Sequence, residues 1–385
     1  MFFAERMQRL GTESAFEVLA RARELEAQGK HIIHLEIGEP DFDTPAHVRQ
    51  AAVKAIESGF THYEPPAGNR EFRAAMAAHV TRSRRVEYSA DEIVIYPGGK
   101  PGIFLGIVAL VEPGDEVICP NPGYPIYESV ANFAGATPVP IVLREENQWR
   151  LDVQELIGLI SDRTRLVVLN SPQNPTGGVL TQEDLEAIAA VCIEKDIMVM
   201  SDETYETIIY DGQFHSIAAV EGMKERTLIV DCFSKSFAMT GWRLGFSASS
   251  GEVAEALTKL MINVNSCTAS FTQQAGIAAL QGPRDETANM VEVFRQRRDL
   301  VIEGLNQIKG ISCLKPHGAF YAFPNITGTG YSSNELARKL LDEAGVAVLS
   351  GTAFGAHGEG YLRISYAASQ DSLREALRRI GGLLG

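Results

Sequence analysis

The feature that most restricts the fold is a unit that repeats between about residues 92 and 245. Each unit contains a short apolar run, a turn of glycine or polar residues, and a longer stretch with apolar residues at helical spacing. The apolar runs occupy residues 92–96, 116–119, 166–169, 197–200 and 228–230. Strands that are separated by helices pair in parallel, because a parallel connection needs a crossover of about this length. The repeat therefore predicts an α/β fold with a mostly parallel sheet.

The residues just beyond these runs are the first candidates for a functional site. Parallel strands bring their carboxyl ends to one edge of a sheet, and ligands of open α/β sheets bind at that edge. The spacing places there Gly98, Gly99, Tyr124, Asn174, Asp202 and Lys235. Taken singly, each has an ordinary structural interpretation as a turn former, a packed aromatic, a helix cap or a surface amine. Their shared position favours a single ligand site.

The composition excludes several classes of function. The chain has 385 residues and a net charge of −14, which argues against a nucleic-acid-binding surface. Its five cysteines form no C-x-x-C pair, and His31 and His34 have no companion ligands, so neither a disulfide framework nor a metal site is predicted. No uncharged apolar run is long enough to cross a bilayer, and the first residues lack the pattern of a secretion signal. We expect a cytoplasmic protein that does not bind membranes.

Several segments taken together resemble one known family. They are residues 63–68 (YEPPAG), 170–177 (NSPQNPTG), 202–205 (DETY), 234–245 (SKSFAMTGWRLG) and 360–365 (GYLRIS). This set resembles the class I aminotransferases of the fold type I superfamily, which depend on pyridoxal 5'-phosphate (PLP).

The resemblance implies a fold with two unequal domains. The large domain has a mostly parallel seven-stranded sheet flanked by helices, and the smaller α+β domain is built from the N- and C-terminal parts of the chain. We expect an N-terminal arm and small-domain segment at residues 1–40, the large PLP-binding domain at 41–285, and the C-terminal small domain at 286–385.

The resemblance also implies roles at the cofactor ring. Lys235 is expected to bind PLP covalently through its amine, and Asp202 to pair with the pyridine nitrogen. Asn174 and Tyr205 are expected to hydrogen-bond the phenolic oxygen, and Tyr124 to stack on the ring. Lys235, Asp202 and Tyr205 are therefore the candidate catalytic residues.

A second set of residues is implied at the cofactor phosphate. Its members come from two turns and from a neighbouring subunit, and they are Gly98, Gly99, Lys100, Ser234, Arg243 and Tyr63. The two glycines and Lys100 are expected to act through their backbone at a helix start, which attracts anions. Cys232 stands where many relatives have a serine, so Ser234 is expected to contribute more. Because Tyr63 is expected to reach the other subunit's phosphate, the resemblance implies a homodimer.

Gly38, Asn174 and Arg363 are implied at the substrate. The Arg363 guanidinium suits two parallel hydrogen bonds to an α-carboxylate. The expected reaction is ping-pong transfer of an amino group from an L-amino acid to a 2-oxo acid, either 2-oxoglutarate or pyruvate, with the freed Lys235 amine moving the proton. A PLP lyase or decarboxylase and a non-catalytic ligand-sensing module stay open as alternatives. The sequence assigns neither the amino donor nor a second cation for a distal carboxylate.

Overall fold

A central sheet of seven strands dominates the computed structural model, which describes residues 2–385; residue 1 of the expected 1–40 segment lies outside the described residues. The strands in spatial order are β2 (Ile93–Tyr96), β8 (Gly245–Ala248), β7 (Thr227–Cys232), β6 (Met198–Asp202), β5 (Thr164–Asn170), β3 (Glu116–Asn121) and β4 (Thr137–Val142). β8 runs antiparallel to both of its neighbours, and every other neighbouring pair is parallel. The predicted fold, a mostly parallel seven-stranded sheet, is confirmed.

Two strands lie outside the apolar runs that the sequence pattern identified. β4 contains Pro138 and Pro140 and lies at the edge of the sheet, where a missing backbone donor is tolerated. β8 is only four residues long and begins at Gly245. A Cβ at Gly245 would lie 2.5 Å from the carbonyl carbon of Gly98, so the close approach of β8 to the end of β2 requires glycine there.

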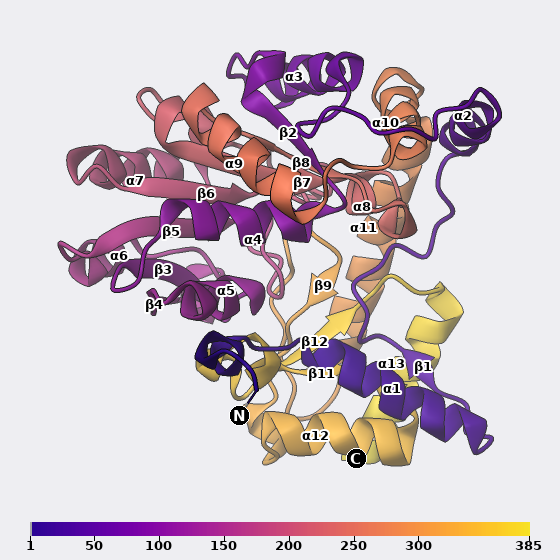
Figure 1. Ribbon diagram of the computed structural model, residues 1–385. Coiled ribbons are helices and arrows are strands. Elements are labelled where there is room, and N and C mark those ends of the chain that lie inside the picture. Colours follow the sequence, from indigo (N-terminus) through magenta and orange to yellow (C-terminus); the bar gives the residue numbers. More distant parts are fainter. Residues whose placement is uncertain (1) are drawn as a thin grey trace.

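Helices cover both faces of the sheet (Figure 1). One face packs against α4 (Gly99–Leu110), α5 (Ile126–Ala134) and α9 (Gly251–Val264). The other face packs against α2 (Ala46–Glu57), α3 (Arg70–Arg84), α6 (Val153–Leu159), α7 (Gln182–Glu194) and α10 (Ser270–Gln281). Successive side chains of β7 point to opposite faces of the sheet. Leu228 and Val230 belong to the apolar cluster on the first face, and Ile229 belongs to a cluster on the second face.

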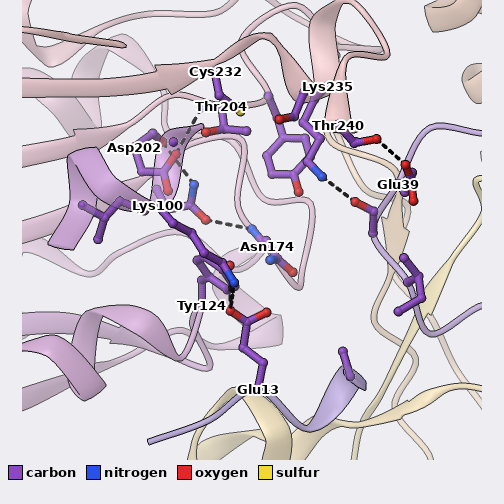
Figure 2. Close-up of a pocket in the computed structure, with 18 of the residues that line it drawn as sticks. Glu13, Glu39, Lys100, Tyr124, Asn174, Asp202, Thr204, Cys232, Lys235 and Thr240 are labelled. Carbon is purple, nitrogen blue, oxygen red and sulfur yellow. Dashed lines mark hydrogen bonds and ion pairs between the residues drawn. The ribbon is translucent and has the colours of Figure 1, made fainter. Parts of the chain in front are cut away.

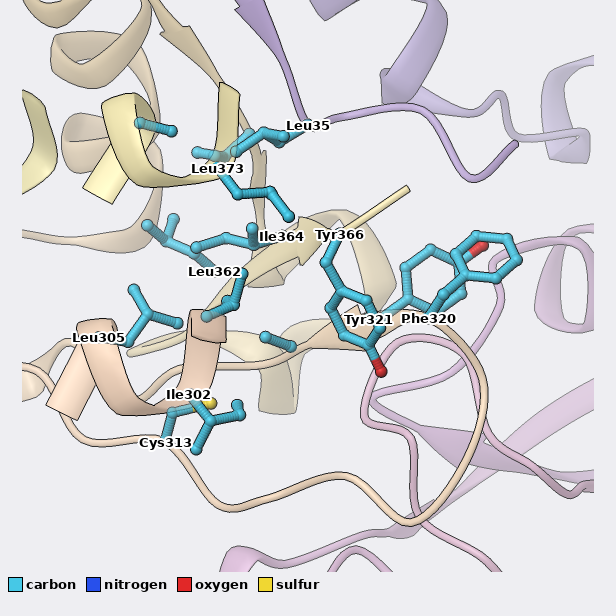
Figure 3. Close-up of a cluster of buried hydrophobic side chains, with 14 of the residues drawn as sticks. Leu35, Ile302, Leu305, Cys313, Phe320, Tyr321, Leu362, Ile364, Tyr366 and Leu373 are labelled. Atoms are coloured by element: carbon cyan, nitrogen blue, oxygen red, sulfur yellow. The ribbon is translucent and has the colours of Figure 1, made fainter. Parts of the chain in front are cut away.

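A smaller unit combines the two ends of the chain. Its elements are α1 (Ser14–Ala27), β1 (Ile33–His34), α11 (Asp285–Asn306), β9 (Tyr321–Ala322), α12 (Ser333–Lys339), β10 (Val346–Ala347), β11 (Leu349–Ser350), β12 (Leu362–Ser365) and α13 (Gln370–Leu384). β1 pairs in parallel with β10, and Leu35 lies in the same apolar cluster as Leu305, Ile364 and Leu373 (Figure 3). Segments that are more than 300 positions apart therefore share one core, as the smaller domain of the predicted fold requires. The domain limits near residues 40 and 285 stay a prediction.

Between residues 2 and 385, no helix combines the length and the apolar character needed to span a membrane.

Candidate active site

A cavity of 450 Å³ lies at the carboxyl edge of the sheet, where it meets the smaller unit (Figure 2). Strand ends, the N-terminus of α4, the loop after β1 and β12 all contribute to its walls. The predicted residues that line it are Gly38, Gly99, Lys100, Tyr124, Asn174, Asp202, Tyr205, Ser234, Lys235, Arg243 and Arg363. The fold therefore brings almost the whole predicted set together, from positions spread over most of the chain.

Gly98 and Gly99 form the start of α4 at one end of this cavity. Gly98 has a φ of +103°, and a Cβ there would lie 2.1 Å from Nη2 of Arg243, so only glycine fits. No side chain caps the helix, which leaves its first backbone N–H groups available to an anion. Ser234 and Arg243 line the same cavity, and Arg243 Nη1 donates to the Thr240 carbonyl at 2.8 Å. Free backbone N–H groups, a hydroxyl and a guanidinium are the groups that bind a phosphate.

Asp202 is the last residue of β6, and its carboxylate is buried beside the cavity. It accepts hydrogen bonds from the Tyr127 hydroxyl at 2.6 Å and from the Thr204 backbone N–H at 3.2 Å. Burial raises the pKa of Asp202, while these two donors and the Lys235 ammonium act in the opposite direction. A buried carboxylate of this kind is suited to pair with a cationic N–H group of a ligand.

Lys235 lies in the short helix α8 (Phe233–Ser236), which follows directly on β7. Its Nζ donates a hydrogen bond to the Gly38 carbonyl. The same nitrogen lies 6.0 Å from the ring centroid of Tyr205 and 5.7 Å from that of Phe320. The amine therefore lies where the sheet edge and the smaller unit meet.

Arg363, in β12, is only 5% exposed, yet no carboxylate within the described chain pairs with it. Its Nη1 donates to the Asn174 side-chain oxygen at 3.2 Å, and its guanidinium carbon lies 4.5 Å from the Tyr321 ring centroid. Its Nε is buried and has no hydrogen-bond partner in the described chain. Arg363 also lines the cavity, and a buried cation without a carboxylate partner at such a place is suited to receive an anion.

The Lys100 side chain makes contacts of its own, in addition to the backbone role that is predicted for this residue. Its side chain forms an ion pair with Glu13, just before α1, and lies 5.8 Å from the ring centroid of Tyr124. The Tyr124 hydroxyl donates to the same Glu13 carboxylate at 3.0 Å. Glu13 was not predicted, because nothing in its local sequence connects it to residues 87 and 111 positions away.

Two predicted residues do not line the cavity: Gly98, which directly precedes the lining residue Gly99, and Tyr63. The side chain of Tyr63 is 89% exposed, and it does not line the cavity that contains Lys235. A second cavity, of 530 Å³, shares Thr240 and Arg243 with the first and also contacts Trp242 and Phe271. Within one chain, Tyr63 therefore has no contact with the phosphate-type site.

Tyr127 and Tyr321 also line the cavity, although sequence reasoning did not select them. Tyr127 lies in the apolar helix α5 and Tyr321 in a short buried strand, where an aromatic is expected as packing. No group of three or more His, Cys, Asp or Glu side chains among residues 2–385 could hold a metal ion.

Three comparisons with known proteins agree with this geometry. Residues 30–380 match the family model described as "Aminotransferase class I and II". An aspartate aminotransferase of Pyrococcus horikoshii is 42% identical over 98% of this chain and 96% of that protein. The aromatic-amino-acid aminotransferase 2 of Thermococcus litoralis is 42% identical, with 93% of each chain covered. The solved aspartate aminotransferase of Thermus thermophilus with maleate superposes with a TM-score of 0.96 at 37% identity, and 100% of both chains is covered.

The cavity fits PLP on the evidence of its own residues. The uncapped start of α4 at Gly99 suits a phosphate, the buried Asp202 carboxylate suits a protonated ring nitrogen, and the Lys235 amine suits an aldehyde. All three groups open on one cavity. The chain belongs to the class I and II aminotransferase family and is a PLP-dependent transaminase.

Proposed function

We propose that the predicted residues divide the cavity into a cofactor site and a substrate site. The residues that would hold PLP are Gly98, Gly99, Lys100, Tyr124, Asn174, Asp202, Tyr205, Ser234, Lys235 and Arg243. When bound, this cofactor withdraws electrons from the substrate Cα and so makes its proton removable. The observation that supports the proposal best is that Lys235, Asp202 and the uncompensated Arg363 all line one cavity.

The protein's own groups orient the substrate and move the proton. Arg363 binds the α-carboxylate, with the Gly38 backbone and Asn174 beside it. Lys235 Nζ already contacts the Gly38 carbonyl, so the free amine lies next to that carboxylate and can take up the Cα proton and return it. Asp202 would pair with the ring nitrogen of the bound cofactor and so favour the protonated form of that nitrogen. The two half-reactions use the same site in turn, which predicts ping-pong kinetics.

We infer that the amino donor is an acidic amino acid of the aspartate class and that the acceptor is 2-oxoglutarate or pyruvate. Lys100 supports this inference, because it is a partly exposed cation of the cavity and its present partner is the Glu13 carboxylate. A distal carboxylate of the substrate can replace Glu13 without any new charge being buried. The nearby rings of Tyr124 and Phe16 give an aromatic donor an apolar surface, so it is the second candidate.

A donor panel with both acceptors tests this substrate class. We expect aspartate to be used best, and Lys100→Met to lower its kcat/KM about tenfold or more while phenylalanine is affected less. The exposed Lys309→Met is the matched control. If aspartate yields ammonia without transfer to either acceptor, the enzyme is a lyase and the proposal is wrong.

We further propose a homodimer in which Tyr63 of one subunit reaches the phosphate site of the other. Its exposure and the second cavity beside Arg243 support this arrangement. Mixing inactive Lys235→Ala with Tyr63→Leu chains tests it. A mixed dimer contains one site with both Lys235 and Tyr63, so activity at low PLP concentration should recover. If mixing restores nothing while the chains exchange, Tyr63 acts within its own subunit or not at all.

A cytoplasmic location is also proposed. The five free cysteines, four of them buried, support it, because chains of oxidising compartments usually pair their cysteines.

A further inference from the structure

Tyr321 connects the two halves of the cavity. It lies in β9 at the border of the apolar cluster of the smaller unit, and it is 1% exposed (Figure 3). Its hydroxyl forms a hydrogen bond of 2.7 Å with the hydroxyl of Tyr205, which follows β6 of the large sheet. Its ring lies 4.5 Å from the guanidinium carbon of Arg363. One side chain thus contacts a proposed cofactor residue through its polar end and the proposed carboxylate receptor through its ring face.

The position of the Tyr321 hydroxyl is restricted from a second direction. A Cβ added to Gly38 would lie 2.1 Å from the Tyr321 hydroxyl oxygen and 3.0 Å from its ring carbon Cζ. The backbone at Gly38 therefore packs directly against this hydroxyl, and any side chain at residue 38 would displace it. The hydroxyl is held between Gly38 and Tyr205, with little room to turn elsewhere.

The hydrogen bond to Tyr205 has a direction that matters for the cofactor. If Tyr321 donates, the proton of Tyr205 is free to point toward a ligand oxygen in the cavity, and the accepted bond strengthens Tyr205 as a donor. Burial raises the pKa of Tyr205 well above its usual value, so the group that faces the ligand is the neutral hydroxyl.

We propose that Tyr321 is a positioning residue of the transaminase reaction, whose hydroxyl directs Tyr205 toward the cofactor and whose ring supports the Arg363 guanidinium. The proposal rests on the roles of Tyr205 and Arg363 that are proposed above. In this proposal Tyr321 differs from an ordinary core aromatic, because its hydroxyl acts on Tyr205 and its ring acts on Arg363. Removal of the Tyr321 hydroxyl should change the pH dependence of the cofactor absorbance. Removal of the Tyr321 ring should change the affinity for the substrate.

Two substitutions in the holoenzyme separate the two tasks. Tyr321→Phe keeps the ring over Arg363 and removes only the bond to Tyr205. We expect the pH midpoint of the visible absorbance change of the bound cofactor to rise by roughly half a unit, because one hydrogen bond that favours the deprotonated form is weakened. kcat should fall about fivefold, and the donor KM should stay within about a factor of two. Tyr321→Leu should add a rise of about tenfold in KM, because the ring over the guanidinium is gone.

Tyr366→Phe is the matched control. Tyr366 is fully buried in the same apolar cluster and donates its hydroxyl to the Ala319 carbonyl at 3.3 Å, but it does not line the cavity. Its loss should lower the melting temperature and leave both the pH midpoint and KM unchanged. If Tyr321→Phe shifts the pH midpoint no more than Tyr366→Phe does, the proposal is wrong.

The variant Tyr205→Phe distinguishes failure of the inference from failure of the proposed function. If Tyr205→Phe shifts the pH midpoint and Tyr321→Phe does not, the role of Tyr321 is wrong and that of Tyr205 stands. If Tyr205→Phe shifts nothing, the proposed role of Tyr205 fails and the inference fails with it. If both act, the double variant should shift the midpoint no further than Tyr205→Phe alone, because Tyr321 acts through Tyr205.

Discussion

Two buried arginines of this enzyme have opposite surroundings. Arg84, at the end of α3, is 1% exposed and pairs with Glu203 at 2.8 Å, Glu206 at 3.3 Å and Asp231 at 2.5 Å. Arg363 is almost as deeply buried, but among the described residues no carboxylate pairs with it and its Nε has no partner. The first cation is compensated by its own chain, and the second is not.

The difference indicates that Arg84 serves the stability of the fold and that Arg363 serves the binding of a ligand. An uncompensated buried charge costs several kcal/mol, so a cation used only for structure is expected to have its counter-ions nearby. Arg363 faces the cavity, where an incoming carboxylate can supply the missing charge. The two regions meet at the end of β6. Its last residue, Asp202, contacts Tyr127 beside the cavity, and the next residue, Glu203, contacts Arg84.

Replacement of the structural arginine should have the largest effect. Arg84→Met leaves two buried carboxylates and the partly buried Glu206 without their cation, and we expect the free energy of unfolding to fall by about 3 to 5 kcal/mol. Chemical unfolding measures this loss. The exposed ion pair of Arg49 with Asp43 provides the control, since Arg49→Met should cost less than about 1 kcal/mol. Equal losses in the two variants would contradict the comparison.

Replacement of the binding arginine should act on substrate rather than on stability. Arg363→Met removes a buried charge that the chain does not compensate, so the free energy of unfolding should change by less than about 1 kcal/mol or increase. The KM of the amino donor should rise about a hundredfold, because the paired hydrogen bonds to its carboxylate are lost. Steady-state kinetics with the donor varied provides the measurement. A variant that unfolds like Arg84→Met would show that Arg363 is structural.

Ligand binding should supply the missing counter-ion. Maleate, a dicarboxylate like the acidic substrate class proposed above, is the probe. At a hundred times its Kd it should stabilise the unmodified holoenzyme by about 2.7 kcal/mol. The same concentration should leave the melting temperature of Arg363→Met unchanged, whereas Arg84→Lys should keep the full increase. Loss of the increase in both variants would mean that the two arginines act as one unit.

The smallest effect concerns pH. His79 lies beside the Arg84 network, and burial together with the nearby arginines 84, 284 and 82 lowers its pKa to about 3. The unfolded chain binds a proton below its ordinary value of 6.5 and the folded chain does not, so stability is lost as the pH falls from 6.5 toward 3. At pH 5 the loss is up to about 2 kcal/mol. The free energy of unfolding of His79→Gln should therefore fall less between pH 6.5 and pH 5 than that of the unmodified protein. If the two proteins lose stability equally over this range, the prediction is wrong.

The sequence by itself determined the parts that depend on short-range patterns. Apolar runs and helical spacing indicated five of the seven strands of the central sheet and the helices between them. Motifs of a few residues were enough to select Asn174, Asp202, Lys235 and Arg363, because each stands at a strand end or in a segment with a distinctive order of residues.

Only the tertiary structure decided which distant side chains meet. Tyr205 and Tyr321 are 116 positions apart, and Glu13 is 111 positions from Tyr124, so no local pattern could connect them. The tertiary structure also placed β8 antiparallel between β2 and β7 and left Tyr63 on the surface. The physical reason is that periodicity reports which face of an element is buried, whereas a contact between two elements depends on how the whole chain packs.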